Sequence, residues 1–151
     1  MNQRTIAVSL AALAGLAAFT SGTPAHAQEA AVLRDLDAQG RSTLSKEELT
    51  LLLPGAKMSR LTAGGNTQLW KNDTDGSFVI SSDNRDRAGA NSTAQGKWHI
   101  SEDGRYCVLI EWRRNPTEEW CRYVLKAGAD YYSARSDKNA TEKLYKLTIS
   151  K

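Results

Sequence analysis

The sequence has few of the residues with which enzymes most often perform chemistry. Its 151 residues include two histidines and two cysteines, and they contain no C-x-x-C pair, no G-x-S-x-G frame and no glycine-rich phosphate loop. His26 lies in an N-terminal segment described below, and His99 alternates with Trp98 and Ile100, so we expect it to face solvent. The sequence therefore predicts a protein that is not an enzyme and has no catalytic residue, metal ligand or cofactor.

A large excess of charge is missing too. The formal net charge is +3 at pH 7, and residues of both signs are interspersed along the chain. This pattern is typical of an ordinary solvated surface and predicts no nucleic-acid partner.

Long apolar runs are absent except near the N-terminus. The run Ile6–Phe19 is shorter than the roughly 20 residues that span a membrane, follows Arg4 and precedes the sequence Ala25-His26-Ala27. We interpret residues 1–27 as a secretory signal peptide, the alternative being an uncleaved anchor. Residues 28–151 then form a single β-rich domain, which we expect to be periplasmic or secreted and not inserted in a membrane after cleavage.

The acidic segment that begins at Asp35 matches part of a calcium-binding loop. Lys46, however, stands where the loop needs a glutamate, which argues against calcium. Ser45 and Glu48 instead form a capping box, and a short leucine-rich helix is predicted over residues 46–53. The lead before this segment, residues 28–38, is polar and has little to hold it in place.

After Gly55 the chain is typical of strands and tight turns. Eight short strands are predicted over about residues 57–149, with a polar loop over residues 82–95. The fold class is therefore mainly β: an antiparallel meander of about eight strands, which we expect to close into a small lipocalin-like barrel. Such a barrel is either filled by side chains or holds one small ligand. Both faces of the strand 105–112 are apolar, so we expect the helix over 46–53 to cover its outer face.

The two cysteines lie in neighbouring strands of one hairpin. If the strands pair about Arg114, Cys107 and Cys121 face each other directly, and an exported protein meets an oxidising compartment. The sequence therefore predicts a Cys107–Cys121 disulfide.

Aromatic residues give the clearest indication of a binding site, because tryptophan and tyrosine offer flat apolar area with a polar group. Core packing is the alternative for most of them. The acidic residues near turns, such as Glu118, Glu119, Asp73 and Asp75, are expected to be solvated, and N-x-S/T sequences at Asn72, Asn91 and Asn139 to mark exposed loops. The candidate ligand- or partner-binding residues are Trp98, Trp112, Trp120, Arg113, Tyr131 and Tyr132.

Several of these features occur together in one known family. They are the segment Leu44–Gly55 and the motifs Gly96-Lys97-Trp98, Gly104-Arg105-Tyr106-Cys107, Trp112, Trp120-Cys121-Arg122 and Tyr131-Tyr132. In them the chain resembles a family of small exported proteobacterial proteins catalogued as domain of unknown function 995. The resemblance implies a location in the bacterial envelope or outside the cell, and it implies no catalytic residues.

These observations favour a non-enzymatic binding module. Its partner is expected to be a small apolar or sugar-like ligand, or a protein of the envelope or the extracellular space. The alternatives are an inhibitor of an extracellular enzyme that uses the loop over residues 82–95, and, with less support, a hydrolase.

Overall fold

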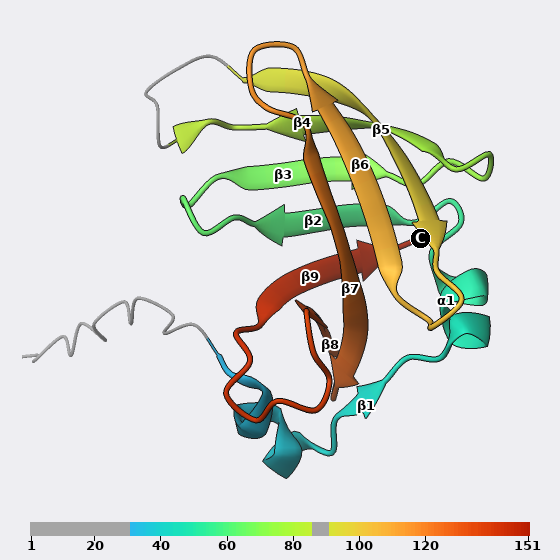
Figure 1. Cartoon of the computed structure of the whole chain (residues 1–151), viewed down its shortest axis with the longest axis vertical. Coiled ribbons are helices and arrows are strands. Elements are labelled where there is room, and N and C mark those ends of the chain that lie inside the picture. Colours follow the sequence, from blue (N-terminus) through green and yellow to red (C-terminus); the bar gives the residue numbers. More distant parts are fainter. Residues whose placement is uncertain (1–30, 86–90) are drawn as a thin grey trace, which may run out of the picture.

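The computed structural model describes residues 31–85 and 91–151 and shows a closed antiparallel β-barrel (Figure 1). The segment interpreted as a signal peptide lies outside the described residues. Neighbouring strands in the chain are neighbours in the sheet from β2 to β9, and β9 pairs with β2 to close it. The predicted meander of eight strands and its closure are therefore confirmed. The barrel strands are β2 Lys57–Leu61, β3 Thr67–Lys71, β4 Ser77–Ser82, β5 Ser92–Ile100, β6 Tyr106–Trp112, β7 Glu118–Ala127, β8 Asp130–Ala134 and β9 Tyr145–Ser150.

Strand β5 is longer than the sequence indicated. Residues 92–95 were expected to belong to a polar loop, but Ser92 pairs with Ser82 and Gln95 with Val79 across β4. Polar residues are compatible with a strand when alternate side chains face solvent, as Thr93 and Gln95 do here. The loop predicted over residues 82–95 is therefore shorter, and its residues 86–90 lie outside the described part of the chain.

The hairpin of β6 and β7 has the predicted register. Cys107 lies directly opposite Cys121, and the pair forms a disulfide with a Cα–Cα distance of 4.0 Å. The disulfide links two adjacent barrel strands. Cys107 lies on the same face of β6 as the half-buried Leu109. Both cysteine predictions, the pairing and the hairpin, are confirmed.

Helix α1 (Lys46–Leu52) begins at the expected capping box. The Ser45 hydroxyl accepts a hydrogen bond from the Glu48 backbone N–H, and the Glu48 carboxylate accepts one from the Ser45 N–H. Leu49 and Leu53 pack in the same apolar cluster as inward-facing barrel residues such as Val108. The expectation that this helix covers the outer face of β6 was wrong, because its leucines fill one end of the barrel interior.

The described part of the lead before α1, residues 31–38, is anchored, contrary to expectation. Leu33 and Leu36 belong to a short 3-10 helix, η1 (Leu33–Gln39), and both are buried against the outer side of β7 and β8. The short strand β1 (Ser42–Thr43) then pairs with the second half of β7. The segment also contains several polar residues, and the apolar contact that holds it comes mainly from these two leucines.

The apolar part of the interior contains a buried hydrogen-bond network. The side-chain oxygen of Asn72 accepts from the Trp70 indole at 3.1 Å and from the Tyr106 hydroxyl at 2.8 Å. The Asn72 amide in turn donates to the Leu53 carbonyl at 3.3 Å, next to α1. Asn72 is fully buried, so the prediction that its N-x-S/T sequence marks an exposed loop was wrong, whereas Asn91 and Asn139 are exposed.

Candidate functional site

A cavity of about 520 Å³ opens at the end of the barrel away from α1. Helix α1 lies beside the end where β2 begins, and the β2–β3 hairpin lies at the other end (Figure 1). The cavity is bounded by that hairpin, by the facing ends of β4 and β5, and by the β6–β7 turn. The residues that line it are Arg60, Leu61, Thr62, Ala63, Gly64, Asn66, Gln68, Ser82, Asn84, Ser92, Trp112, Asn115, Pro116, Thr117, Glu118, Arg122 and Tyr145.

The register of four consecutive strands produces the polar wall of this cavity. Arg60 on β2 lies opposite Gln68 on β3, which lies opposite Ser82 on β4, which lies opposite Ser92 on β5. Residues two positions away on the same strands and the same face form the apolar layer below, where Met58 pairs with Trp70 and Trp70 with Ile80. The interior therefore changes from apolar to polar along its axis, with the cavity in the polar part.

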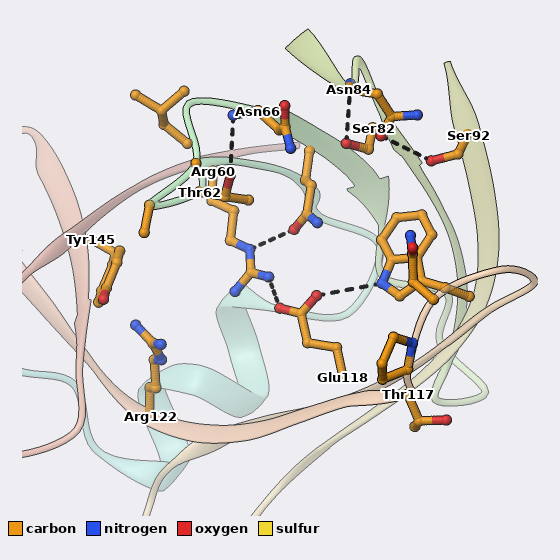
Figure 2. Close-up of a pocket in the computed structure, with 17 residues that line it drawn as sticks. Arg60, Thr62, Asn66, Ser82, Asn84, Ser92, Thr117, Glu118, Arg122 and Tyr145 are labelled. Carbon is orange, nitrogen blue, oxygen red and sulfur yellow. Dashed lines mark hydrogen bonds and ion pairs between the residues drawn. The ribbon is translucent and has the colours of Figure 1, made fainter. Parts of the chain in front are cut away.

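Arg60 is held by a hydrogen-bonded group of side chains. Its Nε donates to the Gln68 side-chain oxygen at 2.7 Å, and its Nη2 forms an ion pair with Glu118 (Figure 2). The other carboxylate oxygen of Glu118 accepts from the Trp112 indole at 3.4 Å. Glu118 was expected to be a solvated turn residue, and this was wrong: it begins β7 and its side chain is 34% exposed and faces Arg60.

Arg122, on β7, is the second cation of the cavity and is held by aromatic rings. Its guanidinium carbon lies 4.2 Å from the ring centroid of Tyr145 and 5.3 Å from that of Trp120. The residue is 9% exposed. Burial, and secondly the neighbouring charge of Arg60, lowers the pKa of the Arg122 guanidinium from its ordinary value.

Trp120 separates the two arginines from the apolar layer. Arg60 lies over its ring at 4.8 Å from the centroid, and the edge of the ring packs against Tyr106 at a centroid distance of 5.7 Å. The hydroxyl of Tyr106 belongs to the Asn72 network, and its burial raises the pKa of the phenol well above its usual range. The base of the cavity is therefore fixed by packing and hydrogen bonds from the core.

The predicted binding residues separate into those near the cavity and those away from it. Trp112 lines the cavity, and Trp120 contacts both of its arginines. Trp98 lies on β5 and donates its indole N–H to the Asp73 carbonyl at 2.9 Å, while Arg113 is exposed in the β6–β7 turn. The two remaining residues lie on β8, where Tyr131 packs against the barrel interior and Tyr132 against the cluster around η1.

Most of the residues that line the cavity were not among the candidates from the sequence, and four of them are Arg60, Gln68, Arg122 and Tyr145. A signal for two of them was present, because Arg60 shares the inward parity of Met58 and Arg122 that of Val124. A charged residue on the buried side of a strand is unusual enough to indicate a functional position. The signal was missed because charged residues were assigned to the surface by type rather than by strand parity.

The other candidate centres are accounted for by local structure. His99 is exposed on the outer face of β5. Asp35 accepts from the Val32 backbone N–H at 2.8 Å, and Asp37 pairs with Arg41 at 2.6 Å. In residues 31–85 and 91–151, no three His, Cys, Asp or Glu side chains lie close enough together to hold a metal ion.

Comparison with known proteins identifies the family. Residues 8–120 match the family model described as "Protein of unknown function (DUF995)", so the chain belongs to this family. No curated protein and no solved structure gives a significant match. Of the helices in the described part of the chain, none is both long and apolar enough to cross a membrane.

Proposed function

We propose that this protein is a periplasmic or secreted, non-enzymatic binding module that takes a small polar ligand into the open end of its barrel. The observation that carries the proposal is the cavity itself. Its volume of about 520 Å³ is in the range of ligand pockets in proteins, roughly 300–1,000 Å³. A barrel that had only to fold would fill this end with side chains, as it does at the α1 end.

The lining of the cavity favours a hydroxylated ligand over an apolar one. Gln68, Ser82, Ser92 and Thr117 carry donors and acceptors that suit hydroxyl groups. Trp112 adds a flat apolar surface against which a sugar ring can lie. A monosaccharide or a similarly small polyhydroxylated compound therefore fits both the size and the chemistry.

The alternative functions have less support. An inhibitor was expected to use the loop over residues 82–95, but four residues of that loop belong to β5. A hydrolase needs an acid–base pair at its site, and Glu118 is the one carboxylate among the residues that line the cavity. His99 lies on the outer surface of the barrel, away from it.

The proposal is tested by placing a bulky side chain at the rim of the cavity. Ala63 lines the cavity and is exposed, so Ala63→Trp should obstruct the entrance without disturbing the core. Ala129→Trp, in the exposed β7–β8 turn, is the matched control. The ¹⁵N-labelled protein is titrated with a panel of monosaccharides and their acids, and the indole N–H signals of Trp112 and Trp120 are followed by NMR.

We expect at least one compound to shift these signals saturably, and we expect Ala63→Trp alone to weaken its binding by about tenfold or more, which corresponds to about 1.4 kcal/mol. Equal binding by the two variants would place the ligand elsewhere. A panel that shifts neither indole signal would contradict the proposed cavity function.

A further inference from the structure

The charges inside the cavity do not balance. The lining contains two arginines, Arg60 and Arg122, and one acidic residue, Glu118. The Glu118 carboxylate forms its ion pair with Arg60 and its remaining hydrogen bond with Trp112. Among the described residues, this leaves one positive charge in the cavity without a carboxylate partner, and that charge is on Arg122.

Arg122 is oriented by its neighbours, but one of its nitrogen atoms has no hydrogen-bond partner in the described structure. Its guanidinium is held by the rings of Tyr145 and Trp120, and the nitrogen without a partner is Nε. Figure 2 shows Arg122 directed into the cavity beside Tyr145, on the wall opposite Arg60. An arginine remains protonated in proteins, so it retains its charge although burial and Arg60 both oppose it.

Such an arrangement is costly unless a bound group completes it. A buried polar atom without a partner costs about 1–3 kcal/mol, and more when it is charged. The aromatic rings fix the plane of the guanidinium, so its N–H donors are already arranged for a planar or tetrahedral oxyanion. An anion placed beside the guanidinium of Arg122 would neutralise the excess charge and relieve the repulsion from Arg60.

We propose that the ligand is a small hydroxylated acid, such as a sugar acid, whose single carboxylate binds to the guanidinium of Arg122 while its hydroxyl groups face the polar wall of Gln68 and Ser82. The inference rests on the proposed function and names its substrate class. A phosphate group offers the same oxyanion chemistry, and the experiment below separates the two.

The test compares acids with neutral compounds of the same shape. The full-length protein is titrated with D-glucuronate and D-glucose, with D-galacturonate and D-galactose, and with inorganic phosphate. Occupancy of the cavity is followed by the Trp112 and Trp120 indole signals, and contact with the anion by the Nε–H signal of Arg122. We expect an acid to bind at least about tenfold more tightly than its neutral counterpart and to shift all three signals.

Variants of Arg122 show whether the preference comes from this residue. Arg122→Gln should weaken binding of the acid by about tenfold or more, and by a clearly larger factor than it weakens binding of the neutral sugar. Arg122→Lys keeps the charge but loses the planar fork, so its affinity for the acid should lie between those of the wild type and Arg122→Gln. Arg34→Gln removes an exposed arginine on η1 and should change nothing. Arg122→Gln loses the contacts of the guanidinium with the rings of Tyr145 and Trp120, so its fold is checked independently by the dispersion of its amide signals in the same NMR spectra.

The outcomes separate this inference from the function on which it rests. Equal affinity for acid and neutral sugar, or an acid preference that survives Arg122→Gln, overturns the inference and leaves the cavity as a binding site for neutral compounds. Tighter binding of phosphate than of every sugar acid would overturn the inference that the group bound by Arg122 is a carboxylate. If no compound shifts the two indole signals, the proposed function fails and the inference fails with it.

Discussion

At the scale of the residue, the apolar part of the barrel interior contains a closely packed pair on neighbouring strands. Gly96 on β5 lies directly opposite Phe78 on β4, and both face inward. A Cβ atom on Gly96 would lie 2.2 Å from two ring carbons of Phe78. The glycine is therefore required by the space that the phenylalanine ring occupies, and its backbone lies outside the left-handed region.

Gly96→Ala should destabilise the protein by about 1–3 kcal/mol, because the Phe78 ring must move within a packed core. Urea unfolding of the wild type and the variant measures the difference. Gln95→Ala, on the exposed face of the same strand, should change the free energy of unfolding by less than about 0.5 kcal/mol. A Gly96→Ala variant as stable as the wild type would show that the ring has room to move.

At the scale of the element, the Asn72 network ties the end of β3 to β6 and to α1. It joins side chains of Trp70 and Tyr106 to the backbone carbonyl of Leu53, and all of these residues are buried. Polar atoms at such a depth stabilise an arrangement in which every partner is in place and penalise any other. The network therefore helps to fix how α1 closes its end of the barrel.

Asn72→Ala should lower the free energy of unfolding by about 1–3 kcal/mol, because the Tyr106 hydroxyl and the Leu53 carbonyl lose a buried partner. Thermal and urea unfolding measure this. Asn139→Ala, in an exposed turn where the side chain accepts from Thr141, is the matched control and should have a much smaller effect. If both variants unfold alike, the network does not stabilise the closed end.

At the scale of the whole molecule, strand parity and turn chemistry made most of the fold predictable. The alternation of apolar and polar residues predicted that Phe78 and Ile80 face the same side of their strand, and both are buried in the barrel. The symmetry of the hairpin about Arg114 predicted the disulfide. Closure between β2 and β9 was expected only from the number of strands, since no local pattern specifies a pairing between Arg60 and Leu147. Whether the first and last strands of a barrel pair depends on the register between every pair of neighbouring strands in between.

The candidate site was less predictable because it depends on that same closure. Trp112 was selected as an aromatic beside a turn, and it lines the cavity. Arg60, Arg122 and Tyr145 lie on β2, β7 and β9, and they come together only when the barrel closes. Glu118 was taken for a turn residue because β7 begins earlier than expected, although Glu118 has the same inward parity as Arg122 and Val124.

The central claim is that the open end of the barrel binds a small acid through Arg122. The most direct measurement is a crystal structure of the protein with the sugar acid that binds most tightly in the titrations. We predict electron density for the acid inside the cavity, with its carboxylate within hydrogen-bond distance of the Arg122 guanidinium and its ring beside Trp112. Density for the acid on the outer surface of the barrel, or in the cavity with its carboxylate turned away from Arg122, would contradict the account.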